Sequence, residues 1–123
     1  MSKQKRIFIL DQNRIVGFDL KMQLENNGYV ICRQDSFVDL QLLAGQNAPD
    51  LIVSDIGIQQ QDDFKEVKTI FMQRQLPIIC IGTSTNEQAT KDCKGINIIG
   101  TFSKPFDSKE ILELVDQYFD SEQ

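Results

Sequence analysis

Short apolar runs alternate along this chain with segments of helical pattern, and this alternation constrains the fold more than any other feature. The apolar runs predict strands at residues 6–10, 29–33, 51–54, 77–81 and 96–102. The segments between and after them predict helices at 15–26, 36–44, 62–74, 86–93 and 108–119, with the tail after Phe119 frayed. Strands that alternate with helices are typical of βαβ units around a parallel sheet.

We therefore expect an α/β fold, a flavodoxin-like, doubly wound sheet of five parallel strands with five helices. Right-handed crossovers leave few alternatives to the strand order 2-1-3-4-5. Residues 6–10, 51–54 and 77–81 are almost continuously apolar, which predicts that these strands are central and covered on both faces. A chain of 123 residues predicts one domain over 1–123.

Charge and composition exclude several classes of protein. A formal net charge of −5 argues against binding to nucleic acid, which needs clustered Lys and Arg. No apolar run is long enough for a membrane span or a signal peptide, so we expect a cytoplasmic protein without membrane contact. Its cysteines, Cys32, Cys80 and Cys93, form no CxxC pair, which predicts reduced, mostly buried thiols. No histidine is present, so any chemistry must use carboxylates, lysine and hydroxyls.

Polar residues follow four of the predicted strands at the point where each strand ends. Asp11 follows the first, Asp55 the third, residues 82–84 (Gly-Thr-Ser) the fourth, and Lys104 closes the fifth. Because parallel strands end at one edge of the sheet, these side chains are expected to converge there. Asp11 could equally be a helix cap and Lys104 a solvated surface charge, whereas no helix starts near Asp55 for it to cap.

In its motifs the chain resembles the receiver domain of two-component response regulators over nearly its whole length. The motifs occur in the family's order, as IFILDQN, PDLIVSDIGI, LPIICIGTS and GTFSKPF. The most specific of them are PDLIVSD and the Lys-Pro-Phe that closes the fifth strand.

This resemblance implies a role for each matching residue. Asp55 would accept a phosphoryl group from an external phosphohistidine, and Lys104 would pair with that group. Asp11, Asp55 and the backbone carbonyl of Gly57 would hold Mg²⁺. Mg²⁺ prefers hard oxygen ligands and neutralises charge as a phosphoryl group reaches a carboxylate, and lysine supplies a compact positive charge.

Three positions depart from the family pattern. Gln12 replaces the second acidic Mg²⁺ ligand, and one full charge removed at about 3 Å from a divalent ion is worth roughly 3 kcal/mol even at the dielectric of water. We therefore expect weakened metal binding. Gly82 stands where the switch hydroxyl belongs, and the adjacent Thr83 serves only if the strand end slips by one residue. Thr101 replaces the usual aromatic, while Phe102 should face the other way.

Two readings of the function follow. In the first, the chain is a stand-alone response regulator that is phosphorylated on Asp55 by a histidine kinase or a histidine phosphotransfer protein. It would signal to a protein target through the surface of residues 86–93, 96–102 and the last helix, with catalysis limited to its own phosphorylation and dephosphorylation. In the second, it is a phosphorylation-independent pseudo-receiver that binds a partner through that surface. Both readings allow the chain to form a homodimer.

Two further hypotheses are disfavoured. An Mg²⁺-dependent phosphatase with Asp55 as nucleophile would need a second acid two residues later, where Gly57 stands. An FMN-binding protein would share the fold, but the loop at residues 82–85 that resembles a phosphate cradle follows the fourth strand instead of the first.

Overall fold

The computed structural model describes residues 4–10, 14–35, 43, 45–55, 64–81, 94–103 and 106–121. For residues 14–17, 33–35, 55 and 64 it describes the backbone. The elements in chain order are β1 (Arg6–Leu10), α1 (Arg14–Asn26), β2 (Val30–Asp35), β3 (Leu51–Asp55), α3 (Phe64–Arg74), β4 (Ile78–Ile81), β5 (Ile98–Phe102) and α5 (Ser108–Ser121).

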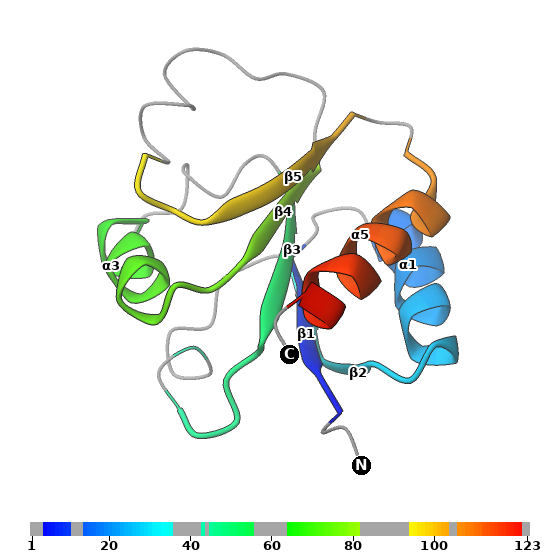
Figure 1. Ribbon diagram of the computed structural model, residues 1–123, viewed down its shortest axis with the longest axis horizontal. Coiled ribbons are helices and arrows are strands. Elements are labelled where there is room, and N and C mark those ends of the chain that lie inside the picture. Colours follow the sequence, from blue (N-terminus) through cyan, green and yellow to red (C-terminus); the bar gives the residue numbers. More distant parts are fainter. Residues whose placement is uncertain are drawn as a thin grey trace.

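The strands form one parallel sheet in the order β2-β1-β3-β4-β5, which confirms the predicted topology. Helices α1 and α5 cover one face of this sheet and α3 covers the other (Figure 1). Of the five predicted helices these three are described. The other two, at residues 36–44 and 86–93, lie outside the described residues apart from Leu43, which is helical and buried. None of the described helices is long and apolar enough to cross a membrane.

Several strands begin later than the sequence pattern predicts, because backbone groups near their starts have other partners. The Tyr29 amide donates to the Leu24 carbonyl and closes α1, so β2 begins at Val30. Pro77 has no amide hydrogen, and β4 begins after it at Ile78. The Ile98 amide donates to the Ile96 carbonyl in a local turn, so β5 begins at Ile98.

Three elements end later in the sequence than predicted. β2 continues to Asp35, two residues beyond the predicted end of that strand. β3 continues to Asp55, which is its last residue instead of the residue after the strand. α5 continues through Phe119 to Ser121, where frayed structure was expected. The Ser121 hydroxyl donates to the Gln117 carbonyl one turn earlier, and Phe119 is 9% exposed, so packing holds the last turn of the helix.

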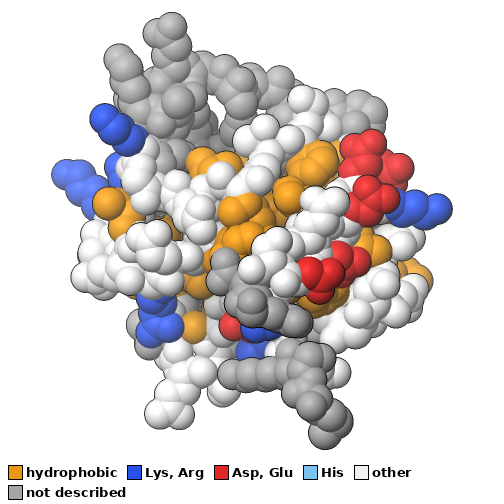
Figure 2. Space-filling view, in the orientation of Figure 1, with side chains coloured by type: hydrophobic (Ala, Val, Ile, Leu, Met, Phe, Trp, Pro, Cys, Tyr) orange, Lys and Arg blue, Asp and Glu red, His pale blue; other side chains and the backbone are white. Residues whose placement is uncertain are grey.

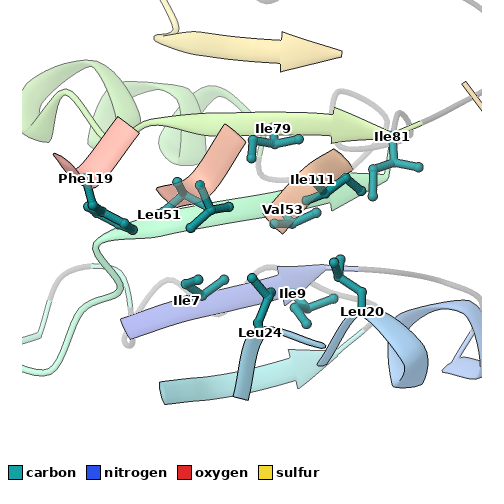
Figure 3. Packing of buried hydrophobic residues seen from close by; sticks show 11 residues of the cluster. Ile7, Ile9, Leu20, Leu24, Leu51, Val53, Ile79, Ile81, Ile111 and Phe119 are labelled. Carbon is teal, nitrogen blue, oxygen red and sulfur yellow. The ribbon is translucent and has the colours of Figure 1, made fainter. Parts of the chain in front are cut away.

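The sheet separates two hydrophobic clusters, one on each face. The larger, which we call the α1/α5 cluster, joins strands β1, β3 and β4 to these two helices, as Figure 3 shows. Its buried members are Ile7, Ile9, Leu20, Leu24, Leu51, Val53, Ile79, Ile81, Ile111, Val115 and Phe119. The α3 cluster on the opposite face consists of Phe8, Leu10, Leu43, Ile52, Val67, Phe71, Leu76 and Ile78. Alternate residues of the central strands enter opposite clusters, as expected of strands covered on both faces.

Helix α1 ends as the sequence predicts. Leu20 and Leu24 of the predicted apolar stripe are buried, while the side chain of Val16 lies outside the described residues. The Asn27 and Gly28 amides donate to carbonyls of the last turn, and Gly28 has a φ of 92°. A positive φ is accessible to glycine at little cost, which explains why the helix stops there.

Helix α5 comes close to β5 over Gly100. A Cβ at position 100 would overlap with Leu114 Cδ2. Leu114 therefore fills the space that a side chain at position 100 would take. β5 itself is at the edge of the sheet and carries the exposed residues Ile98 and Thr101.

Candidate functional site

The carboxyl ends of four strands lie side by side at one edge of the sheet. Leu10, the last residue of β1, pairs with Ser54 of β3. Asp55 pairs with Ile81, and Ile81 pairs with Phe102 of β5. The predicted gathering of these strand ends is therefore confirmed at the level of the backbone, with Asp55 between the ends of β1 and β4.

Asp55 is itself the last residue of β3, and the other predicted site residues follow their strand ends within two residues. Asp55 is described as backbone only. The others lie outside the described residues: Asp11, Gln12, Gly57, Gly82, Thr83 and Lys104. Their grouping into one pocket, and the choice between Gly82 and Thr83 as the switch residue, stay predictions.

The donor groups predicted for the metal fit Mg²⁺ by their chemistry. Asp11 and Asp55 offer carboxylate oxygens, Gln12 an amide oxygen and Gly57 a backbone carbonyl, all of them hard ligands. The set contains no thiolate or imidazole that would favour zinc or copper. Its weakness is its charge, because it carries two carboxylates where the family pattern has three.

In β5, Thr101 and Phe102 face differently, as the sequence predicts. Thr101 is exposed, whereas Phe102 is partly buried against the α1/α5 cluster. The position that carries an aromatic in the family pattern therefore holds an exposed hydroxyl here. Phe102 cannot replace that aromatic without leaving the cluster.

Asp50, the second residue of the PDLIVSD motif, makes contacts that the sequence pattern does not predict. Its carboxylate accepts a hydrogen bond of 2.8 Å from the Arg6 amide, and its own amide donates to the Arg6 carbonyl at 2.7 Å. Arg6 is the first residue of β1. Asp50 thus joins the beginning of β1 to the chain just before β3, at the end of the strands opposite the candidate site.

α5 begins at Ser108, as predicted, and its cap is the preceding residue, Asp107. The Asp107 carboxylate accepts from the Lys109 amide at 2.9 Å, and the Asp107 carbonyl accepts from the Glu110 amide. Asp107 and Glu110 have the spacing of a capping box, a signal that could have identified this cap. Ser108 is the first helical residue, and its hydroxyl donates to Asp19 Oδ2 of α1 at 2.7 Å.

Near its carboxyl end, α5 is joined to the start of β2. The Tyr29 hydroxyl donates to the Asp116 carboxylate, and the Tyr29 ring lies 5.8 Å from that of Phe119. Burial, the hydrogen bond to Asp116 and the nearby charges of Asp116 and Asp120 raise the pKa of Tyr29. The phenol therefore stays protonated throughout the physiological range. Lys5 Nζ lies 5.3 Å from the centre of the Phe119 ring on the same side of the sheet.

The two described cysteines, Cys32 and Cys80, form no disulfide, as predicted, and they are half-buried where mostly buried thiols were expected. Both pack against the α3 cluster. Burial raises the pKa of Cys32. Cys93 lies outside the described residues.

Comparison with known proteins identifies the fold and the family. The family model described as the response regulator receiver domain matches residues 7–116. A signal receiver domain of an HD domain-containing protein from Pseudomonas fluorescens Pf-5 superposes with a TM-score of 0.78 at 21% identity, covering 97% of each chain. A CheY-like receiver domain protein from Methanospirillum hungatei JF-1 gives a TM-score of 0.75 at 16% identity, covering 97% of this chain and 96% of that one.

A sequence relative is also found. It is an uncharacterized 14.6 kDa protein of Leptolyngbya boryana, encoded in the sodA1 3′ region, which is 24% identical over 118 residues. The match covers 94% of this chain and 90% of that protein. Since the family model spans most of the chain and the strand order is that of the solved receiver domains, the chain belongs to the response regulator receiver domain family.

Proposed function

We propose that this chain acts as a single receiver domain that accepts a phosphoryl group on Asp55 from a phosphohistidine of a kinase or phosphotransfer protein. The observation that carries the proposal is the position of Asp55. It is the last residue of the central strand β3, at the edge where β1, β4 and β5 also end. Candidate partners of the reaction follow those three strand ends in the sequence.

In this reaction a carboxylate oxygen of Asp55 attacks the phosphorus atom. The phosphorus–nitrogen bond to the donor histidine breaks, and its electron pair returns to the imidazole. Lys104 would place a positive charge against the phosphoryl oxygens. Asp11, Asp55, Gln12 and the Gly57 carbonyl would hold Mg²⁺, which when bound supplies charge neutralisation for the transfer.

The signal would leave the domain through protein contacts on β5 and α5, together with residues 86–93. α5 carries four acidic residues, Glu110, Glu113, Asp116 and Asp120, and one lysine. Figure 2 shows Asp and Glu side chains gathered on the side of α1 and α5. A target protein with a basic contact surface would be complementary to this face.

A second candidate function is that of a phosphorylation-independent pseudo-receiver. The exposed hydroxyl of Thr101, together with the packed ring of Phe102, favours it. An aromatic at position 101 could turn inward when the domain is phosphorylated, and threonine has no ring to do so. Gln12 and Gly82 favour it as well, because Gln12 removes a charge from the predicted metal site and Gly82 lacks the switch hydroxyl.

The test is incubation with acetyl phosphate, with and without Mg²⁺, followed by intact-mass measurement. A Mg²⁺-dependent gain of one phosphoryl group is expected in the wild type and in Asp50→Asn, and not in Asp55→Asn. The Asp50 variant is a matched control, because it makes the same substitution five residues earlier, where the carboxylate bonds to the Arg6 amide. No adduct together with no Mg²⁺ binding would favour the pseudo-receiver.

A further inference from the structure

A buried hydroxyl joins the two helices that cover one face of the sheet. Ser108, at the start of α5, is 6% exposed, and its Oγ–H donates to Asp19 Oδ2 of α1 at 2.7 Å. The two residues are separated by 89 positions in the sequence. Asp107 already caps the helix, so this bond is not a cap. It gives a partner to a hydroxyl that is buried between α5 and α1, and it thereby joins the two helices.

The bond is of the stronger, charge-assisted kind. A hydroxyl that donates to a carboxylate forms a shorter and stronger hydrogen bond than one between neutral groups. Asp19 also lies at the amino end of α5, where the helix dipole favours negative charge. Two carboxylates thus bind the first turn of α5. One belongs to Asp107, the residue before the helix, and the other to Asp19 of α1.

The first turn of α5 follows closely after the candidate site. Lys104 precedes Ser108 by four residues, and α1 follows Asp11 and Gln12 after a single further residue. We propose that Ser108 is a positioning residue. Through its bond to Asp19 it holds the start of α5 against α1, and so fixes Lys104 relative to Asp11 and Asp55. This inference rests on the function proposed above.

The other end of α5 provides a matched control. The Tyr29 hydroxyl also donates to a carboxylate, that of Asp116, across 87 positions of sequence. Tyr29→Phe removes this bond and keeps the ring, just as Ser108→Ala removes the other bond and keeps a good helix former. Both variants loosen α5 by one hydrogen bond, but only Ser108 lies close in sequence to Lys104.

The first measurement is the rate of adduct formation from acetyl phosphate at saturating Mg²⁺, with Mg²⁺ affinity measured in parallel by calorimetry. Ser108→Ala is expected to slow phosphorylation by about threefold or more, since small displacements of a catalytic group are costly. Its Mg²⁺ affinity should be unchanged, because no metal ligand is altered. Ser108→Thr, which keeps the hydroxyl, should restore the rate, and Tyr29→Phe should match the wild type.

The second measurement does not depend on phosphorylation. In protein labelled with ¹³C-lysine, the Lys104 Cε signal, assigned with Lys104→Arg, should move in Ser108→Ala and stay in place in Tyr29→Phe. If the wild type forms no adduct, the proposed function is wrong. The Lys104 signal still tests the positioning role of Ser108 in that case. Should Ser108→Ala fail to fold, Asp19→Ala removes the acceptor of the same bond at an exposed position, and both measurements are repeated on that variant.

Two outcomes would overturn the inference. One is a Lys104 signal and a phosphorylation rate that are both unchanged when the Ser108–Asp19 bond is removed. The other is an equal effect of Tyr29→Phe, which would mean that general loosening of α5, and not the position of Ser108, governs the site.

Discussion

Replacing Asp50 by alanine tests the role of the PDLIVSD motif in placing β1. Asp50 makes two hydrogen bonds to Arg6, one through its carboxylate and one through its amide. The substitution removes the first and keeps the second. Because Arg6 begins β1, and β1 pairs with both β2 and β3, loss of this bond should loosen the start of two strand pairings.

The magnitude follows from the geometry of the bond. A hydrogen bond to a charged group contributes about 1.5–3 kcal/mol, and the half-buried position of Asp50 places the expected loss near the lower end. For 123 residues the entropy of unfolding is about 0.26 kcal/mol/K near 60 °C. A loss of about 1.5 kcal/mol therefore corresponds to a fall in Tm of about 6 °C.

Thermal unfolding followed by circular dichroism measures this fall in Tm. Faster hydrogen exchange of the Arg6 amide would show that the loss of stability arises at the start of β1. Asp50→Asn keeps an oxygen acceptor of the same shape without the charge, so it should lose about half as much stability. Equal Tm values for the two variants, or an alanine variant as stable as the wild type, would refute the reasoning.

Three further predictions concern the site and the described titratable groups. Gln12→Asp should tighten Mg²⁺ binding by about tenfold or more, measured by calorimetry, because it adds a full negative charge to the donor set; unchanged affinity would contradict that account. The pKa of Tyr29 is raised on folding, so its contribution to stability is present below about pH 10 and is lost as the pH rises further. Urea unfolding should therefore show that Tyr29→Phe lowers the free energy of unfolding by less at pH 11 than at pH 8. Equal losses at the two pH values would count against the raised pKa. Burial raises the pKa of Cys32, so iodoacetamide should label it more slowly in the folded protein than in urea, as peptide mass analysis can show; equal rates would mean that the thiol is accessible.

The order of the sheet could be predicted from sequence because the pattern that determines it is long and repeated. Five apolar runs separated by helical segments leave few topologies, and the apolar character of β1, β3 and β4 marks them as central. The ends of strands were less predictable. At Tyr29 and Ile96, a residue of strand-like type makes its hydrogen bonds within a turn, and hydrophobicity carries no information about that choice.

The meeting of four strand ends was predictable for the same reason, since parallel strands all end at one edge of the sheet. The side-chain contacts between segments distant in the sequence were not predictable. Asp19 and Ser108 are 89 residues apart, and each has an ordinary local explanation as a polar residue of a helix. Asp50 looks like part of a turn before β3 until its partner Arg6 is known. Pairings of this kind depend on three-dimensional proximity, which periodicity does not encode.

The absence of a side chain at Gly100 has a consequence for engineering this domain. The Leu114 side chain occupies the space above that glycine, so α5 packs closely on the edge strand β5 at this point. A larger residue at position 100 would displace the Leu114 side chain and change the packing of α5 on β5. That single position therefore offers a way to alter, from beneath, the surface proposed above for contact with a target protein, without changing any residue on that surface.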